Sequence, residues 1–303
     1  EEVQQETNKI LQERIKNYDV KRWASDFILS LDNMSIIRDK YLSSKISPPV
    51  ISNIINEYKK ADRKVLFLDY DGTLVNYERN PRKAKPDKEL YEILDQLSRH
   101  ENNHVVLVTG RDKDTFNEWF SSRNYTLIAE HGAWMKEPDK EWVKTDNGKM
   151  NNEWKELMIP IMNFTRDRTP GSIVEEKSHS IAWHYRNSDP DQGALRAMEL
   201  KEELNSLISN LNLEVIEGNK FLEIKNSAFN KGKAAMDYSR RNSFDFILAI
   251  GDDFTDEYLY EELPESAFTL KVGHSKTLAK YSLESFKEAR SILKEIKNTR
   301  NSN

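Results

Sequence analysis

Two aspartates, Asp69 and Asp71, close an apolar run at residues 67–75, which reads F-L-D-Y-D-G-T-L-V. The run predicts a buried strand, and the Gly72-Thr73 pair after it predicts a sharp turn. Like charges at this spacing repel each other, and by itself the pattern could equally be a loop that its aspartates cap. A carboxylate placed there can attack phosphorus and form an aspartyl phosphate, which divides one difficult hydrolysis into two easier displacements.

Three further polar clusters follow apolar runs or begin helices: Thr109 in V-T-G-R, Lys231 in N-K-G-K and Asp252 in G-D-D-F-T-D-E. Taken singly, a strand-end threonine or a helix-start lysine is usually structural. As an ordered set they suit phosphoryl transfer, because a phosphate dianion must be neutralised and oriented before a carboxylate can approach it. We expect Lys231 and the Thr109 hydroxyl to bind the phosphoryl oxygens.

The remaining positive charge is expected from Mg²⁺, which prefers oxygen ligands in octahedral geometry. We expect its acidic residues to be Asp69, Asp71, Asp252 and Asp256, and the sequence leaves open whether Asp253 or Asp256 is the second acidic residue of the last motif. Asp71 is also expected to protonate the leaving sugar oxygen and later to take a proton from the attacking water.

These side chains need a scaffold that brings strand ends together. Apolar runs that end in polar residues recur along the chain, at 104–111, 125–132, 244–253 and 267–273. Helical patterns lie between them, at 87–98 and 231–240. The predicted fold class is therefore α/β, a Rossmann-like parallel sheet flanked by helices, in which ligands bind beyond the carboxyl ends of the strands.

The pattern changes in the middle of the chain. An alternating stretch at 172–186, a helical stretch at 191–211 and a hairpin at 213–225 predict a small α+β unit inserted into the first domain. We therefore expect three parts: a helical segment at 1–60, a catalytic core at 61–145 and 224–303, and an α+β cap at 146–223.

Composition excludes several classes of function. The net charge of -5 and the pI near 5.8 give no electrostatic reason to expect nucleic acid or an anionic membrane as a partner. The apolar runs fall far short of the roughly 20 residues that a membrane helix needs. The chain has no cysteine, which excludes disulfides and thiolate catalysis and fits a cytoplasmic location.

The clusters around Asp69, Thr109, Lys231 and Asp252 resemble the four motifs of the haloacid dehalogenase superfamily, and Asp71 resembles the second aspartate of its phosphatase branches. Within that superfamily the chain is similar to the trehalose-6-phosphate phosphatase family. The similarity lies in V-T-G-R (108–111), A-E-H-G (129–132), V-E-E-K (174–177), A-W-H-Y-R (182–186), F-L-E-I-K (221–225) and G-D-D-F-T-D-E (251–257). Residues 17–31 are similar to the closing helix of trehalose-6-phosphate synthase domains.

The resemblance implies Mg²⁺-dependent hydrolysis of trehalose 6-phosphate, with a synthase domain in the same polypeptide or complex as a partner. The sugar-binding residues that it implies are Arg111, Glu130 and His131 from the core, Glu175, Lys177 and His179 from the cap, and Glu223 from near the hinge. From the strand pattern alone, His179 could instead be a solvated strand residue, and Glu175 and Lys177 could simply pair with each other.

Two other functions stay open at this point. One is a phosphatase that acts on another sugar phosphate, such as sucrose phosphate or a mannosyl phosphate. The other is a non-catalytic module that senses phosphosugars for an attached synthase. The sensing function predicts damage at the nucleophile, the general acid, the lysine or the metal aspartate, and all four residue types are intact in this sequence.

Overall fold

The computed structural model describes residues 44–78, 80–145, 152–209 and 211–298. Residues 1–43 of the predicted helical segment, including the synthase-like stretch at 17–31, lie outside these residues. All elements named below belong to one compact unit, formed by residues 43–275 and 279–303. None of the described helices combines the length and the apolar character that a bilayer crossing requires.

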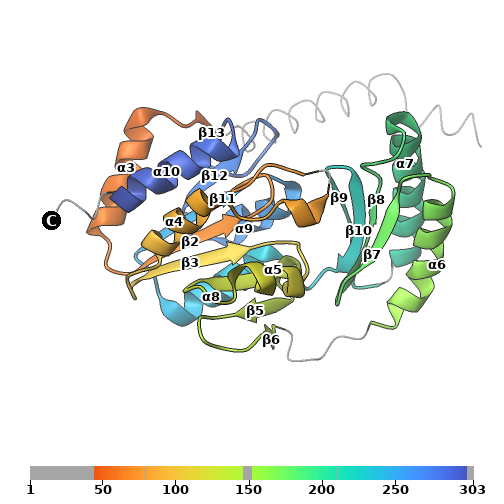
Figure 1. The fold of residues 1–303 in the computed structure, drawn as a ribbon, viewed down its shortest axis with the longest axis horizontal. Helices are drawn as coiled ribbons and strands as arrows, with labels where there is room; N and C mark the ends of the chain where they lie inside the picture. Colours follow the sequence, from red (N-terminus) through yellow and green to blue (C-terminus); the bar gives the residue numbers. More distant parts are fainter. Residues whose placement is uncertain (1–43, 79, 146–151, 210, 299–303) are drawn as a thin grey trace, which may run out of the picture. The chain divides into compact units, whose positions relative to one another are not determined.

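Within the described residues the larger sheet has nine strands, in the order β1-β13-β12-β11-β2-β3-β4-β5-β6 (Figure 1). Their bounds are Ser44–Lys45 (β1), Tyr281–Leu283 (β13), Phe268–Val272 (β12), Phe246–Gly251 (β11), Lys64–Asp69 (β2), Asn103–Val108 (β3), Thr126–Ala129 (β4), Trp134–Lys136 (β5) and Val143–Lys144 (β6). Neighbours from β1 to β4 run parallel, and β5 and β6 continue the sheet antiparallel. The predicted α/β fold is confirmed, with the correction that one edge is antiparallel.

The register of the central strands decides what meets at their carboxyl ends. Leu68 on β2 pairs with Ile250 on β11, and Asp69 pairs with Val108 on β3. Residues that directly follow β3 and β11 therefore lie beside Asp69. Because all three strands point the same way, the sheet delivers Thr109, Asp69 and the acidic loop after β11 to one edge.

Helices cover both faces of the larger sheet (Figure 1). Leu66 and Leu68 of β2 share one apolar cluster with residues of α3 (Pro48–Lys60), α4 (Lys88–Leu97), α5 (Lys113–Phe120) and α10 (Phe286–Asn298). The alternate residue Phe67 points to the other face, where its ring contacts Tyr238 of α8 (Lys231–Asn242). A strand that is buried on both faces is apolar throughout, which explains the continuous run before Asp69.

Local capping explains where three of these helices begin. Asp87 accepts a hydrogen bond from the Leu90 amide before α4, and Asp112 accepts one from the Thr115 amide before α5. The Asn230 side chain accepts a hydrogen bond from the Lys233 amide and so makes Lys231 the first residue of α8. Such caps satisfy amides that have no partner inside the helix.

A second, four-stranded antiparallel sheet has the order β7-β8-β10-β9. Its strands are Ile173–Glu176 (β7), Ser180–His184 (β8), Phe221–Asn226 (β10) and Leu213–Gly218 (β9). Successive side chains along each strand point to opposite faces of this sheet. Helices α6 (Trp154–Asp167) and α7 (Pro190–Ile208) cover one side of this sheet (Figure 1). Trp183 and Leu222 pack against these helices, whereas Glu223 and its cross-strand neighbour Ala182 lie on the opposite face.

Three parts of the chain differ from the sequence prediction. Helix α6 was not predicted, because Pro160 interrupts its pattern and no side chain caps its start. Residues 44–60 were assigned to a separate helical segment, yet β1 extends the larger sheet and Ile54 and Tyr58 of α3 are buried in its core. The strand β10 also runs past residue 223, where the predicted cap ends.

Candidate active site

The carboxyl ends of β2 and β11 bring three carboxylates together. Asp69 is the last residue of β2, Asp252 directly follows β11, and Asp256 ends the short 3-10 helix η3 (Phe254–Asp256). One carboxylate oxygen from each lies within 4.8 Å of the other two. Asp69 and Asp256 are buried, and Asp252 is partly exposed.

Lys231 reaches this acidic cluster from the first turn of α8. Its Nζ donates to Asp69 Oδ1 at 2.7 Å and to Asp256 Oδ1 at 2.8 Å. Burial lowers the pKa of Lys231, but the charges of Asp256 and Asp69 outweigh burial and hold this pKa well above its usual value. The close packing of α8 against Tyr258 requires glycine at position 232, because a Cβ atom there would lie 1.9 Å from the Tyr258 carbonyl oxygen.

The two oxygens of Asp69 have different surroundings. Oδ1 accepts the hydrogen bond from Lys231, whereas Oδ2 is buried and has no hydrogen-bond partner among the described residues. Burial and the charge of Asp256 raise the pKa of Asp69 well above its usual value, although Lys231 acts in the opposite direction. A buried oxygen without a partner costs free energy, so Oδ2 marks a place where a ligand atom belongs.

The formal charges of the cluster are unbalanced, because Lys231 supplies one positive charge against the three aspartates. Burial, followed by the charges of Asp253 and Asp256, raises the pKa of Asp252 to about 7. A divalent cation would neutralise the excess, and donors that are all oxygen suit Mg²⁺, Mn²⁺ or Ca²⁺. These residues therefore fit a divalent cation.

The loop after β11 shows which of Asp253 and Asp256 lies in the acidic cluster. Asp256 belongs to the acidic cluster, and its Oδ2 accepts the amides of Asp252 and Asp253 at 2.9 and 3.1 Å. The Asp253 carboxylate instead turns to Thr255, accepting its amide at 2.8 Å and its hydroxyl at 2.6 Å. Asp256 thus shapes the loop as well as facing Lys231.

The side chain of Asp71 pairs with Arg111 and does not belong to the acidic cluster of Asp69, Asp252 and Asp256. Arg111 donates Nε to Asp71 Oδ2 and Nη2 to Asp71 Oδ1, both at 2.6 Å, and its guanidinium lies 4.8 Å from the Trp119 ring. We expected Asp71 to take part in the metal site and Arg111 to line a sugar pocket; in the structure the two side chains pair with each other, and both roles stay predictions. Each oxygen of Asp71 thus accepts one guanidinium hydrogen bond, and this bidentate pair fixes the orientation of the carboxylate.

Thr109 lies where the sequence predicts it, directly after β3 and fully buried. Its hydroxyl oxygen accepts the Arg111 amide at 3.1 Å, and its carbonyl accepts the His131 amide at 3.0 Å. The hydroxyl proton is therefore left to donate to another group. Gly110 is required next to it, because a Cβ atom there would lie 2.4 Å from Cε1 of His131.

Glu223 on β10 is the centre of a second polar network, which we call the junction network: Glu223, Lys177, Ser180, His131 and the Gly110 carbonyl. Glu223 Oε1 accepts Lys177 Nζ at 2.9 Å and Ser180 Oγ at 2.5 Å, and Oε2 lies 3.2 Å from His131 Nε2. Lys177 also donates to the Gly110 carbonyl at 3.0 Å. The network joins the smaller sheet to loops of the larger sheet.

Burial raises the pKa of Glu223, but the charge of Lys177 and contact with His131 outweigh it and hold this pKa well below its usual value. Burial lowers the pKa of His131, which keeps the imidazole neutral near neutral pH. The charged pair at the centre of the network is thus Lys177 and Glu223.

The other predicted sugar-binding residues lie around this network. Glu130 accepts Ser178 Oγ at 2.9 Å and the His179 amide at 3.3 Å. Burial raises the pKa of Glu130. His179 is buried, with ring contacts to Trp134 and Phe229, so its alternative assignment as a solvated strand residue is wrong.

Glu175 pairs with His184, with 2.8 Å between Glu175 Oε2 and His184 Nε2, while Lys177 pairs with Glu223. The alternative in which Glu175 and Lys177 pair with each other is therefore not what the structure shows. Burial raises the pKa of Glu175, but the contact with His184 outweighs it and the net shift is downward.

Sequence analysis missed three residues that hold the acidic loop. Tyr77 donates its hydroxyl to Asp252 Oδ2 at 2.7 Å, Thr73 donates to Asp252 Oδ1 at 3.1 Å, and Lys271 donates to the Asp253 carbonyl at 2.8 Å. Thr73 belongs to the D-Y-D-G-T motif and could have been found there. Tyr77 and Lys271 carry no local signal, because their partners are far away in the sequence.

Replacing Glu223 with glutamine should lower the free energy of unfolding by about 3 kcal/mol at neutral pH, because buried Lys177 loses its counter-charge. The folded-state pKa of Glu223 lies well below the usual 4.5. The stabilisation is therefore complete above about pH 4.5 and is lost as the pH falls through the folded-state value. Urea unfolding at neutral and acidic pH should show the difference between the two proteins shrink on acidification.

The control for this variant is Glu199→Gln, which removes a half-exposed glutamate that pairs with Arg196 on α7. Exposed pairs contribute about 0–1 kcal/mol, so this variant should unfold like the parent chain. A Glu223→Gln variant as stable as the control would show that the junction network does not depend on the charge of Glu223.

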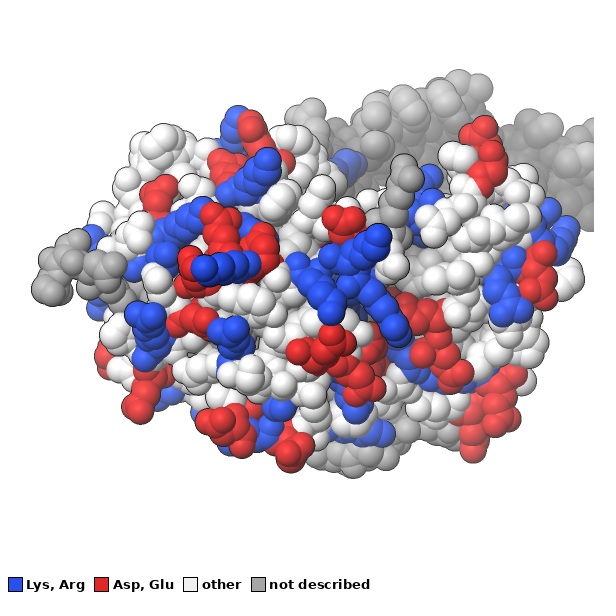
Figure 2. All heavy atoms as spheres, in the orientation of Figure 1, with Lys and Arg blue, Asp and Glu red and all other residues white. Residues whose placement is uncertain are grey.

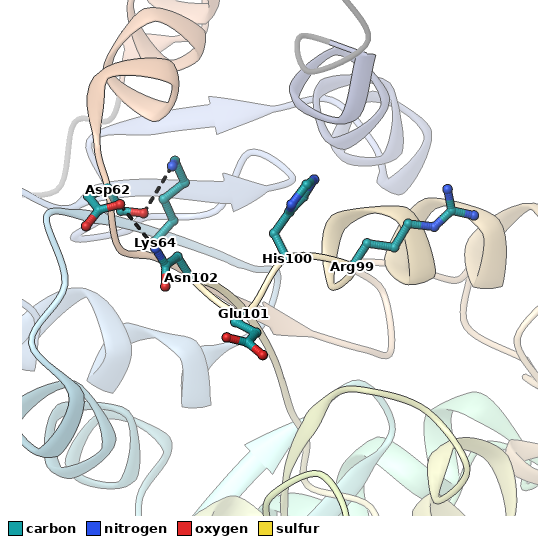
Figure 3. Close-up of a pocket in the computed structure, with 6 residues that line it drawn as sticks. All are labelled: Asp62, Lys64, Arg99, His100, Glu101 and Asn102. Carbon is teal, nitrogen blue, oxygen red and sulfur yellow. Dashed lines mark hydrogen bonds between the residues drawn. The ribbon is translucent and has the colours of Figure 1, made fainter. Parts of the chain in front are cut away.

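A surface pocket lies at the opposite end of β2 (Figure 3). Its lining residues are Asp62, Lys64, Arg99, His100, Glu101 and Asn102. Lys64 is the first residue of β2 and Asp69 the last, so the pocket lies at the amino ends of the strands. We assign it no part in the candidate site. On the face drawn in Figure 2, basic and acidic side chains of the described residues are interspersed.

Comparison with known proteins was made on the sequence and on the fold. Residues 67–290 match the family model of the trehalose-phosphatases. The chain is 35% identical, over 95% of its length, to a bifunctional trehalose-6-phosphate synthase/phosphatase of Thermoproteus tenax. It is 32% identical, over 80% of its length, to a trehalose-phosphatase of Saccharomyces cerevisiae. The chain spans only 39% and 30% of the lengths of these two relatives.

Among solved structures, the C-terminal domain of a C. albicans trehalose-6-phosphate phosphatase matches with a TM-score of 0.80 and 28% identity, over 85% of this chain and 99% of that one. A haloacid dehalogenase-like hydrolase from B. subtilis matches with a TM-score of 0.52 and 13% identity, over 77% of this chain and 98% of that one. The second match shows the fold alone and confirms the haloacid dehalogenase-like core.

Proposed function

The chain belongs to the trehalose-phosphatase family, and from this premise we propose that it hydrolyses trehalose 6-phosphate to trehalose and phosphate, the second step of trehalose biosynthesis. The observation that carries the proposal is Oδ2 of Asp69, which is buried and has no hydrogen-bond partner in the described part of the chain, while Oδ1 of the same residue accepts from Lys231. Asp69 lies within the residues that match the family model. The arrangement supplies a nucleophile and a cation at one point.

In the proposed reaction Asp69 Oδ2 attacks phosphorus, the bond between phosphorus and the sugar oxygen breaks, and an aspartyl phosphate forms. Water then attacks this phosphorus, and Asp69 is regenerated with release of phosphate. Lys231 holds Oδ1 of the nucleophile and counters charge that develops on the phosphoryl group. The Thr109 hydroxyl donates its proton to a phosphoryl oxygen.

Asp69, Asp252 and Asp256 are the residues that would hold Mg²⁺, which when bound supplies the positive charge that lets a carboxylate approach a phosphate dianion. Asp71 protonates the leaving sugar oxygen in the first step and takes a proton from water in the second. We propose that sugar hydroxyls compete for Arg111 when substrate binds, so that its pair with Asp71 opens and the carboxylate can turn toward the leaving oxygen. Asp71 would contribute its backbone carbonyl to the cation, which leaves its carboxylate for proton transfer.

We propose that the smaller sheet with α6 and α7 is a cap, close to the predicted bounds of 146–223, on a core of 61–145 and 224–303. Two features support this: the smaller sheet has its own apolar core, and the junction network ties its polar face to loops beside Thr109. Opening of the network would expose the hydrogen-bonding groups of Glu130, His131, Lys177 and Glu223, and with them those of Glu175 and His179, to sugar hydroxyls.

A synthase domain in the same polypeptide or complex is the proposed partner. The Thermoproteus tenax relative is named as a bifunctional synthase and phosphatase, and this chain covers 39% of it. A cytoplasmic location stays a prediction.

Substrate assignment is tested by phosphate release across a panel of sugar phosphates with Mg²⁺ present. We expect release from trehalose 6-phosphate to exceed release from glucose 6-phosphate by about 100-fold or more in kcat/KM, because cap residues can bind the second glucose ring. Comparable rates on both would exclude this substrate and favour a different sugar phosphatase. Binding of trehalose 6-phosphate without any release would favour the sensing module.

A further inference from the structure

Tyr77 lies beside the acidic cluster but has no place in the reaction described above. Its hydroxyl donates to Asp252 Oδ2 at 2.7 Å, while Thr73 occupies Oδ1 of the same carboxylate at 3.1 Å. Asp252 is thereby held from two sides by the segment that follows the nucleophile's strand.

The packing of this segment leaves Asp252 little freedom. At Gly72, where φ is +85°, a Cβ atom would lie 2.1 Å from Asp252 Oδ2 and 2.6 Å from Cε2 of Tyr77. The backbone turn and the tyrosine ring therefore enclose the same carboxylate oxygen. A ligand carboxylate that is oriented by such neighbours binds a cation more tightly than one that rotates freely.

Arg186 connects this site to the smaller sheet. It follows β8, and its Nη2 donates to the Asn219 carbonyl in the turn between β9 and β10 at 2.9 Å. Its Nη1 donates to the Glu78 carbonyl at 2.8 Å, and its guanidinium lies 5.4 Å from the centre of the Tyr77 ring. The Arg186 guanidinium thus contacts the backbone next to Tyr77, the Tyr77 ring and a turn of the smaller sheet.

We propose that Tyr77 is a positioning residue that orients Asp252 for the divalent cation, and that Arg186 makes this orientation depend on the position of the smaller sheet. This inference rests on the proposed metal site. Its consequence is that closure of the cap strengthens cation binding, so that the cation is held most tightly when substrate is enclosed. The coupling is reciprocal, because the cation must then also favour the closed arrangement.

The test is calorimetric titration of the whole chain with Mg²⁺ alone, comparing the parent with Tyr77→Phe and Arg186→Ala. Loss of the Tyr77 hydroxyl should raise the Kd for Mg²⁺ by about 10-fold or more, as losing a partner of a metal ligand commonly does. Arg186→Ala should raise it by about 3-fold or more and should add little on top of Tyr77→Phe, because the two act on the same carboxylate.

Two matched controls separate positioning from general damage. Tyr91→Phe removes a tyrosine hydroxyl that donates to the Trp119 carbonyl, away from Asp252. Arg196→Ala removes an arginine that pairs with Glu199 on α7. Neither should change the Kd for Mg²⁺, whatever its effect on the melting temperature.

The outcomes are distinct. If the parent binds Mg²⁺ and Tyr77→Phe binds it as tightly as Tyr91→Phe does, the positioning role is wrong while the proposed function stands. Full additivity of Tyr77→Phe and Arg186→Ala would overturn the link to the smaller sheet. A parent chain that binds no Mg²⁺ at millimolar concentration would overturn the metal site and this inference together.

Discussion

Replacement of Asp69 with asparagine is expected to reduce kcat on trehalose 6-phosphate by a factor on the order of 10³ or more. The amide fills the same space but cannot attack phosphorus, so no aspartyl phosphate forms. The fold should survive, because the variant removes one carboxylate from a cluster in which negative charge exceeds that of Lys231. Trehalose 6-phosphate should still bind, since the proposed sugar contacts come from other residues.

Phosphate release measures the loss of turnover, and calorimetric titration with trehalose 6-phosphate measures the retained binding. Asp114→Asn is the matched control, because Asp114 is exposed on the first turn of α5 and should keep full activity. An Asp69→Asn variant with a tenth or more of the parent activity would rule out the covalent route.

Replacement of Lys231 with methionine is expected to have the next largest effect. Methionine keeps most of the apolar packing of the side chain but removes the ammonium group that donates to both Asp69 and Asp256. We expect kcat to fall by about 10²–10³, the usual cost of losing a charged group that stabilises a transition state. Without metal, the free energy of unfolding should fall by about 3 kcal/mol, because buried carboxylates are left unpaired.

Mg²⁺ should restore part of the stability of Lys231→Met without restoring its rate, because a cation that binds the folded state stabilises it by mass action. Urea unfolding with and without Mg²⁺ measures the first effect, and phosphate release measures the second. The control is Lys64→Met, since Lys64 is also buried but lies at the opposite end of β2. Equal rates for the two variants would make Lys231 a structural residue only.

Some of the expected contacts were outside the reach of sequence reasoning. Asp71 and Arg111 lie 40 residues apart, and His131 and Glu223 lie 92 apart. Their motifs could be recognised, but their pairing could not, because a side chain's partner depends on how separate loops pack. As a result, residues that were predicted to bind sugar, such as His131, Lys177 and Glu223, instead hydrogen-bond to one another in the structure.

The sequence by itself determined the parallel centre of the larger sheet, the order of its motifs and the expected convergence of Asp69, Thr109, Lys231 and Asp252. Apolar runs show where buried parallel strands end, and a capping asparagine shows where α8 begins, so local signals were sufficient. Only the tertiary structure decided which oxygen of Asp69 is left without a partner, and that Tyr77 holds Asp252 across 175 positions. Those facts follow from packing between distant segments, and no local pattern records them.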